Sequence, residues 1–177
     1  QAEADIDGVL VVDRERRWVS FNQRFLEMWR IPEEIALKRS SPAALEWVME
    51  QLIAPERFVE KILYLYEHLN EESREEIALT SGRIFDRYSA PVKGEDGVYY
   101  GRVWRYRDIT EQKRMEEDLR RFATVVRDSN DAITVQGFDG NIMAWNRSAD
   151  KMYGWSEAEA LKMNVEKIHP DDKRAEA

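Results

Sequence analysis

The first part of the chain alternates between short apolar runs and polar turns. Gly8–Asp13 is an apolar run with several β-branched residues, and Trp18–Phe21 is a second run that follows a charged turn. Two such runs joined by a turn predict a β-hairpin. Asn22 comes next, and its side chain suits a helix N-cap because it can accept a hydrogen bond from a backbone N–H of the first turn. Apolar residues then follow at the helical spacing of Phe25, Met28 and Trp29.

Two more helices and three strands are predicted further along. Ser41–Pro42 and Pro55 each suit a helix start, because proline is favoured at the first helical position. The helix from Pro55 carries an apolar stripe at Phe58, Ile62, Leu65 and Leu69. Strands are predicted at Glu76–Thr80, Arg83–Ala90 and Val98–Asp108. The order strand, strand, helices and three strands predicts an α+β domain, with a five-stranded antiparallel sheet and helices on one face.

The segment from Thr110 to Asp128 predicts a helix of a different kind. Asp108 and Glu111 have the spacing of a capping box, with Asp108 as the cap. The apolar positions form a narrow stripe flanked by mixed charge, which favours a two-helix seam over a broad core face. The seam residues are Met115, Leu119, Phe122 and Val126.

The pattern of residues 7–32 recurs at residues 131–156, an offset of 124 residues. Asn146 repeats the cap position of Asn22, and Gly154 suits the end of the second copy's helix. So long an offset indicates tandem domains, because solenoid repeats run at roughly 20–50 residues. We expect a complete domain at 1–109, a connecting helix at 110–129, and the N-terminal half of a second domain at 130–177. On this interpretation the chain is a piece of a longer protein.

Charge and composition exclude several classes of function. The net charge of −8 and the pI near 5.0 argue against nucleic-acid binding, which usually requires a basic surface. The chain has no cysteine, so it has no disulfide, thiolate metal site or cysteine nucleophile. No apolar run approaches the roughly 18 residues of a membrane span. We expect a cytoplasmic fragment, with any membrane anchor of the parent protein outside it.

Three motifs resemble those of the PAS domain family, in particular tandem S-box repeats of microbial signalling proteins. Asn22 and Asn146 match the family's asparagine after the second strand. Ile168–Asp172, with the sequence Ile-His-Pro-Asp-Asp, is similar to the start of the family's middle helices, and Ile53–Arg57 stands there in the first copy. Arg107–Lys113 resembles the closing Asp-Ile-Thr motif with its charged signalling helix. The resemblance implies a sensory input module.

Neither Asn22 nor His68 indicates a particular cofactor. Asn22 precedes Gln23, whereas blue-light photosensors carry their adduct-forming cysteine at that position, so no covalent flavin adduct can form. His68 stands roughly where haem-binding relatives carry an axial ligand, but its polar setting near a helix end favours a solvated histidine over a haem ligand. The cofactor stays unknown, and we expect no metal site and no catalytic residue. Asn22 is interpreted as a helix cap, with ligand orientation as the alternative.

A small-molecule ligand, if one binds, is expected between the sheet and the helices. The candidate lining residues, which the pattern favours as a filled core first and as pocket lining second, are Phe25, Trp29, Trp47, Phe58 and Ile62. Tyr100, Trp104 and Tyr106 alternate along the last strand. We expect them on the outer face of the sheet, covered by a flanking helix or a partner subunit. Paired glutamates such as Glu71–Glu72 and Glu75–Glu76 are interpreted as solvated surface.

These features favour a non-catalytic sensor fragment that acts as a homodimer and passes signals to a downstream output domain. Such modules usually stand upstream of a histidine kinase, in a two-component phosphorelay, or of a diguanylate cyclase. Asp108, Ile109 and Thr110 join the last strand to the connecting helix, so we expect them to relay the signal. The alternative from another class is a ligand-free scaffold that only sets dimer register and spacing.

Overall fold

The computed structural model describes residues 6–39 and 41–165. The chain forms two compact units, Gln1–Lys113 and Arg114–Ala177, called unit 1 and unit 2 below. The predicted signature at 168–172, including His169, lies outside the described residues.

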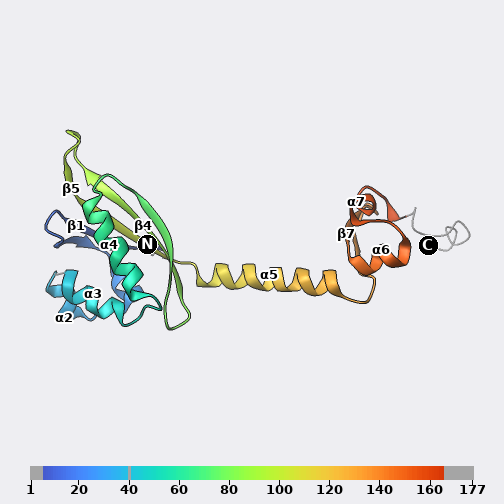
Figure 1. Cartoon of the computed structure of the whole chain (residues 1–177), viewed down its shortest axis with the longest axis horizontal. Helices are drawn as coiled ribbons and strands as arrows, with labels where there is room; N and C mark the ends of the chain where they lie inside the picture. Colours follow the sequence, from blue (N-terminus) through green and yellow to red (C-terminus); the bar gives the residue numbers. More distant parts are fainter. Residues whose placement is uncertain (1–5, 40, 166–177) are drawn as a thin grey trace, which may run out of the picture. The chain divides into compact units, whose positions relative to one another are not determined.

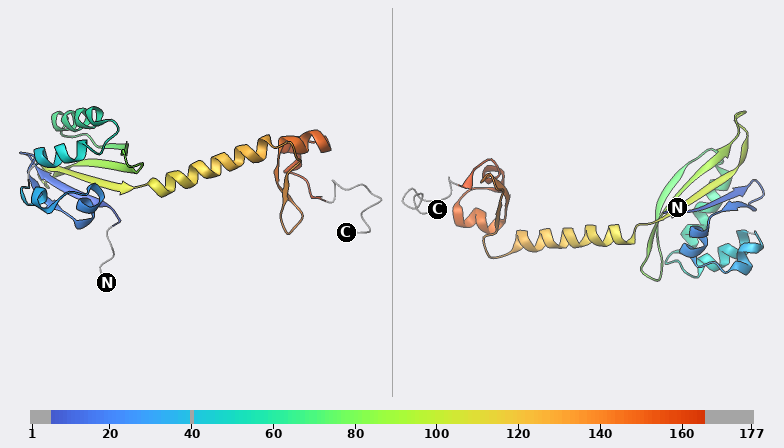
Figure 2. Two further views of the ribbon diagram at one scale, coloured as in Figure 1. Left: turned by 90° about the horizontal axis from the view of Figure 1, so that it is seen from below. Right: turned by 180° about the vertical axis from the view of Figure 1, so that it is seen from behind.

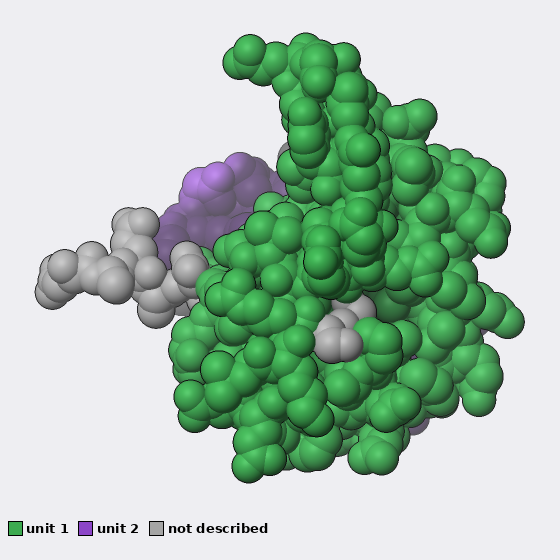
Figure 3. All heavy atoms as spheres, turned by 90° about the vertical axis from the view of Figure 1, so that its left-hand side faces the viewer, with its two compact units in different colours: residues 1–113 green, residues 114–177 purple. Residues whose placement is uncertain are grey.

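Unit 1 contains the five-stranded antiparallel sheet that the sequence predicted, in the strand order β2-β1-β5-β4-β3 (Figure 1). The strands are β1 (Gly8–Asp13), β2 (Trp18–Phe21), β3 (Ser73–Ala78), β4 (Ile84–Lys93) and β5 (Tyr99–Asp108). The predicted third strand begins too late, because β3 pairs with β4 from Ser73 onward. The predicted fourth strand ends too early, because β4 pairs with β5 as far as Lys93. The turn between β4 and β5 projects from the body of unit 1 (Figure 1), and a projection of unit 1 is also visible in the space-filling view (Figure 3).

Four helices lie between β2 and β3 along the chain. They are α1 (Gln23–Trp29), α2 (Glu33–Leu37), α3 (Ser41–Met49) and α4 (Pro55–Glu67). Helices α3 and α4 lie on the same side of the sheet (Figure 2). Phe58 and Leu65 of α4 are buried in the core, as their spacing predicted. Leu69 lies beyond the end of α4 and is exposed, so the predicted stripe was one residue too long.

The sequence prediction for the two faces of β5 was wrong. Trp104 and Tyr106 face the helices and are almost fully buried in the core, while Arg105 and Arg107 are exposed on the opposite face. Strand β5 lies at the centre of the sheet, so one of its faces is covered along its length, and aromatic rings supply the most apolar area there. Tyr100, near the strand's start, is 53% exposed rather than covered.

Two arginines are buried among these aromatic side chains. Arg102 donates hydrogen bonds to the backbone oxygens of Leu65 and Glu71, at the end of α4 and beyond it. Arg87 forms an ion pair with Glu75. Glu75 is therefore not the solvated residue that the sequence suggested, because a buried guanidinium requires a partner of opposite charge.

Helix α5 (Thr110–Asp128) has the predicted bounds, and none of its residues is buried. Its predicted seam is largely in solvent: Leu119 is 71% exposed and Phe122 is 69% exposed, and Met115 is also exposed. Val126 is half-buried, near the end of the helix. The stripe therefore presents Met115, Leu119 and Phe122 to solvent in the described structure.

Unit 2 begins with a two-stranded sheet, β6 (Thr134–Gln136) and β7 (Ile142–Trp145), followed by α6 (Arg147–Tyr153) and α7 (Glu157–Ala160). A small core joins Ile142, Trp145, Ala149 and Ala160. Gly154 ends α6 in the left-handed conformation, as predicted. Met152 and Tyr153 are exposed, although their counterparts Met28 and Trp29 in unit 1 are fully buried.

Candidate functional site

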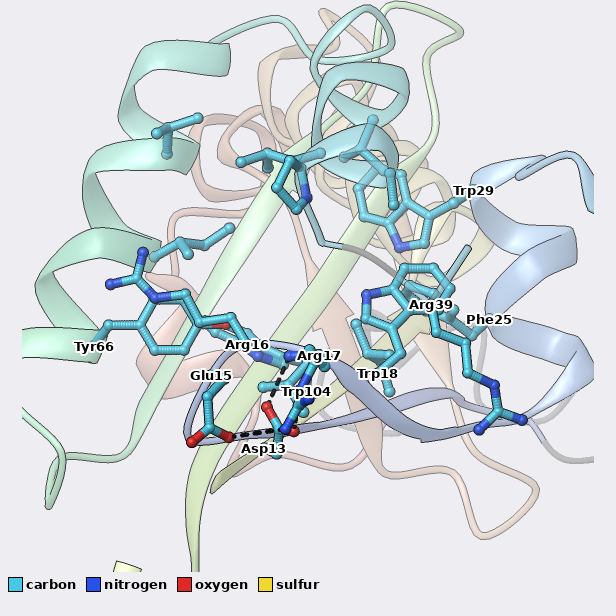
Figure 4. A pocket seen from close by; sticks show the side chains of 18 of the residues that line it. Asp13, Glu15, Arg16, Arg17, Trp18, Phe25, Trp29, Arg39, Tyr66 and Trp104 are labelled. Carbon is cyan, nitrogen blue, oxygen red and sulfur yellow. Dashed lines mark hydrogen bonds and ion pairs between the residues drawn. The ribbon is translucent and has the colours of Figure 1, made fainter. Parts of the chain in front are cut away.

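A cavity of about 800 Å³ lies within unit 1, between the aromatic face of the sheet and the helices (Figure 4). Of the predicted lining residues, Phe25, Trp29, Phe58 and Ile62 border it. Trp47 does not border it, because its ring lies at the surface and its indole Nε1 donates to the backbone oxygen of Trp29 at 3.2 Å. The volume falls in the roughly 300–1,000 Å³ range of small-molecule sites.

Aromatic rings packed edge to face form part of the cavity wall. The ring of Trp29 contacts Phe58 and Tyr106 at centroid distances of 6.1 and 5.2 Å. Trp104 and Tyr106 come from β5, which the sequence had assigned to the outer face, so sequence reasoning missed both. The alternation along β5 places both residues on one face of the strand, but it does not tell which face meets the helices. The remaining apolar lining residues are Leu10, Val12, Trp18, Pro42, Ala44, Leu45, Val48, Val59, Leu63 and Tyr66.

Three polar groups lie in or directly behind this wall. The indole Nε1 of Trp29 is buried and has no hydrogen-bond partner among the described residues. Arg87 lies with its guanidinium carbon 4.3 Å from the Phe58 ring centroid, and its charge is close enough to Tyr106 to act on that hydroxyl. Burial raises the pKa of Tyr106 to about 12, so its hydroxyl stays protonated at neutral pH. The wall thus presents neutral donors rather than a carboxylate.

The rim of the cavity is charged. The β1–β2 turn contributes Asp13, Glu15, Arg16 and Arg17, and the segment after α2 contributes Lys38 and Arg39. Arg17 is paired with Asp13 at 3.0 Å and with Glu15 at 3.3 Å. Figure 4 shows Arg16 reaching from the turn to Tyr66, with 4.5 Å between its guanidinium carbon and the ring centroid. The backbone N–H of Arg17 also lowers the pKa of Asp13.

Asn22 and Asn146 both cap a helix in the predicted way. Asn22 Oδ1 accepts from the backbone N–H of Phe25 at 3.0 Å and from that of Val9 at 2.8 Å. Its Nδ2 donates to the backbone oxygen of Asp7. Asn146 makes the same three bonds, to Ala149, Ile133 and Asp131. Because the Asn22 amide is used by the backbone and does not border the cavity, ligand orientation is not its role here.

Asn146 also holds the end of α5. Its Nδ2 donates to the backbone oxygen of Val126 at 2.9 Å. Nearby, the hydroxyl of Ser148 donates to the backbone oxygen of Ser129 at 2.6 Å. Late carbonyls of a helix have no partner within the helix, so these side chains tie the end of α5 to the start of α6.

The three predicted relay residues lie where β5 passes into α5. Asp108 accepts hydrogen bonds from Arg83 at 2.9 and 3.1 Å and from the backbone N–H of Thr110 at 3.0 Å. The Thr110 hydroxyl also donates to Asp108 and accepts from the backbone N–H of Ile84 at 2.9 Å. Ile109 is buried and donates its N–H to the backbone oxygen of Ile84.

Asp108 does not form the predicted capping box with Glu111. The helix begins at Thr110, so Asp108 lies one residue too early to be the N-cap and bonds Thr110 instead. Burial raises the pKa of Asp108, but the hydrogen bonds from Thr110 and Arg83 outweigh it, and the pKa falls below its usual value. The carboxylate therefore stays charged at neutral pH.

His68 lies away from the cavity. It ends α4 at an exposed position, and its ring stacks on Tyr64 at a centroid distance of 3.9 Å. It does not border the cavity, so a haem there has no axial ligand in His68. Among the described residues, no group of three or more histidine, aspartate or glutamate side chains is placed to hold a metal ion.

Sequence comparison identifies the family. A family model described as "PAS fold" matches residues 6–117, more than half of the chain, and one described as "PAS domain" matches residues 120–176. The chain belongs to the PAS family, as tandem domains. No curated protein sequence matches it. No helix in the described part of the chain is both long enough and apolar enough to cross a membrane.

Solved structures with a similar fold include PAS domains of sensor proteins. The PAS domain from Bordetella pertussis BvgS is 18% identical, with a TM-score of 0.49, and the match covers 68% of this chain and 89% of that one. The PAS domain of the histidine kinase ThkA is 13% identical over 58% of this chain and 99% of that one, with a TM-score of 0.42. The sensor region of a sensor histidine kinase is 16% identical, with a TM-score of 0.47. That match covers 60% of this chain and 40% of the kinase region.

Proposed function

We propose that this chain is the sensory input of a signal-transduction protein, in which a small molecule bound in the unit 1 cavity alters the start of α5. The observation that carries the proposal is a continuous set of contacts from the cavity wall to that helix. Arg83 donates to the backbone oxygen of Met28 at 2.8 Å, and Met28 is the neighbour of the cavity residue Trp29. The same guanidinium holds Asp108.

Each contact in this path is directional, so a shift at one end reaches the other. A ligand that moves α1 moves the Met28 carbonyl, and with it the Arg83 guanidinium. Asp108 follows Arg83 and changes the hydrogen bonds at Thr110, the first residue of α5. The coupling requires that the two states differ in these contacts, because a ligand shifts an equilibrium only through its differential affinity.

The exposed stripe of α5 is the proposed output surface. Met115, Leu119 and Phe122 are more than half exposed, and an apolar stripe of this kind favours a parallel pair with the same helix of a second chain. A parallel homodimer places two downstream output domains side by side. Among output domains, a histidine kinase suits this arrangement because it works as a dimer, and the fragment itself contributes no catalysis.

The test has two readouts on the purified chain. Mass spectrometry of the denatured protein identifies any co-purified small molecule, and hydrogen exchange compares the first turn of α5 with and without that molecule. We expect ligand removal to change exchange at Thr110 and its neighbours, and Arg83→Met to abolish the change while leaving ligand binding intact. Lys93→Met, at the exposed end of β4, is the control.

The outcome separates the sensor from the scaffold. If no small molecule is recovered and no change reaches α5, the domain acts as a ligand-free spacer that sets dimer register. If a ligand binds but exchange in α5 is the same in both states, the path through Arg83 is wrong.

A further inference from the structure

We infer that the cavity selects an organic anion with an apolar body and one oxygen acceptor on that body, such as an oxo-substituted carboxylate. The inference rests on the proposed function, since it names the class of molecule that the cavity would bind. Two independent observations carry it, one at the rim of the cavity and one inside.

The rim is more basic than the rest of the chain. It carries four cationic and two anionic side chains, although the chain has a net charge of −8. Both anions are engaged by Arg17, and neither of these ion pairs involves Lys38 or Arg39. No ion pair of Lys38 or Arg39 is found within residues 6–39 and 41–165. A local excess of positive charge at the mouth of a low-dielectric cavity attracts an anion.

Inside the cavity, a buried hydrogen-bond donor favours a ligand that carries a hydrogen-bond acceptor. The Trp29 side chain is fully buried in the wall, and its indole N–H finds no hydrogen-bond partner in the described structure. A buried donor without a partner is costly, and an oxygen on the bound molecule removes that cost. Apart from the hydroxyls of Tyr66 and Tyr106, the other groups of the inner wall are aromatic or aliphatic, so most of the molecule is apolar.

The ligand would thus carry its negative charge at one end and its acceptor oxygen at another position. The carboxylate lies at the rim near Lys38 and Arg39, and the oxygen acceptor lies deeper, near Trp29. A neutral hydrocarbon leaves both sites unsatisfied, and a small inorganic anion leaves the apolar wall unfilled. Phosphate esters share the charge but need a more polar interior than this one.

Three matched probes test the two sites separately on the full chain. 4-Benzoylbenzoate has an aromatic body, a ketone oxygen and a carboxylate; 4-benzylbenzoate lacks the ketone; 4-methylbenzophenone lacks the charge. Affinities are measured by tryptophan fluorescence and calorimetry. We expect the first probe to bind about 3- to 10-fold more tightly than the second, for one net hydrogen bond. We expect it to bind about 5- to 30-fold more tightly than the third, for two solvent-accessible charge pairs.

Variants assign each preference to its residue. Lys38→Gln with Arg39→Gln should remove the preference for charge and keep the preference for the ketone. Arg57→Gln with Lys61→Gln removes the same charge from α4 outside the cavity and should change neither. Trp29→Phe should remove only the ketone preference, and light-induced cross-linking of 4-benzoylbenzoate should map to the cavity wall. Should Trp29→Phe misfold, the comparison of probes on the unaltered chain still decides.

The results separate this inference from the sensor proposal. Equal affinity for all three probes overturns the inference and leaves a cavity that binds small molecules. Failure of all three, with a cationic or neutral molecule co-purified, likewise overturns it and leaves the sensor proposal standing. Failure of all three with no co-purified molecule removes both.

Discussion

The buried Arg102 offers the sharpest test of how unit 1 is held together. Its guanidinium lies behind the β5 aromatics and bonds the backbone oxygens of Glu71 at 3.0 Å and Leu65 at 3.2 Å and the hydroxyl of Ser89 at 3.1 Å. Arg102→Met keeps most of the apolar stem and deletes the donors. The last turn of α4 and the start of β3 then lose the group that joins them to the sheet.

The expected cost follows from what is left unpaired. Hydrogen bonds from a charged donor contribute about 1.5–3 kcal/mol each, and three acceptors lose theirs. The deletion also removes a buried charge whose Nε has no partner among the described residues, which offsets part of the loss. We expect a net decrease of about 3–5 kcal/mol in the free energy of unfolding of unit 1, a large share of a typical domain's stability.

Arg105→Met is the matched control, three residues along the same strand but on the solvent face. Arg105 is half exposed and lies 3.6 Å from Asp7, so its removal should cost less than about 1 kcal/mol. Hydrogen exchange of β4 and β5 amides across a urea series measures unit 1 separately from unit 2. If the two variants lower the free energy of unfolding equally, it is wrong that Arg102 stabilises unit 1 through its burial and its bonds to backbone carbonyls.

Four further predictions concern single side chains. Leu119→Glu should weaken dimerisation at least about tenfold in analytical ultracentrifugation and leave unit 1 folded. Thr124→Glu, which lies off the stripe, should leave dimerisation unchanged. If the unaltered chain is a monomer, the predicted dimer seam is wrong. Asn22→Ala should lower the stability of unit 1 by about 2 kcal/mol, by chemical denaturation, and Asn22→Asp by less because it keeps the acceptor. Tyr106 has a raised pKa in the folded state, so its contribution to the free energy of unfolding is present below pH 10 and is lost between pH 10 and about 12. Tyr106→Phe should therefore make the stability of unit 1 less dependent on pH in this range, as measured by alkaline unfolding. Asp108 has a lowered pKa, so its contribution to the free energy of unfolding is present above about pH 4 and is lost as the pH falls further. Asp108→Asn should make the stability of unit 1 less dependent on pH in this acidic range.

Local signals predicted much of the fold. The hairpin, both asparagine caps, Pro55 at a helix start and the bounds of α5 depend on residues close together in sequence. Their hydrogen bonds form within a turn or between neighbouring strands, so the pattern alone contains the information. The strand count followed from the same alternation.

Contacts between distant segments explain the failures. Which face of β5 is buried depends on α4 supplying carbonyls to Arg102, and residues 65–71 are more than thirty positions away in sequence. The alternation gave two equivalent faces, each with aromatic or arginine residues, and propensity does not choose between them. Trp47 was assigned to the cavity by type, but the backbone oxygen of Trp29 draws its indole to the surface.

The candidate site was predicted in part. Phe25, Trp29, Phe58 and Ile62 were named because apolar helix faces turn toward a sheet, and they border the cavity. The cationic rim was not foreseen, since Arg16 and Arg39 come from separate loops and nothing local marks them as neighbours. The same holds for Arg83, whose bonds to Met28 and Asp108 join residues far apart in sequence.

Both ends of α5 are fixed by side chains, Asp108 at its first residue and Asn146 at the carbonyl of Val126. Each added residue turns a helix by about 100°. Inserting one residue between Asp108 and Leu119 would therefore rotate Leu119 and the rest of the seam by that angle relative to Asp108. Seven residues restore nearly the same angle, about two full turns. The length of this helix therefore sets the direction in which the stripe faces: insertions of seven residues should preserve that direction relative to Asp108, and insertions of two or five should nearly reverse it.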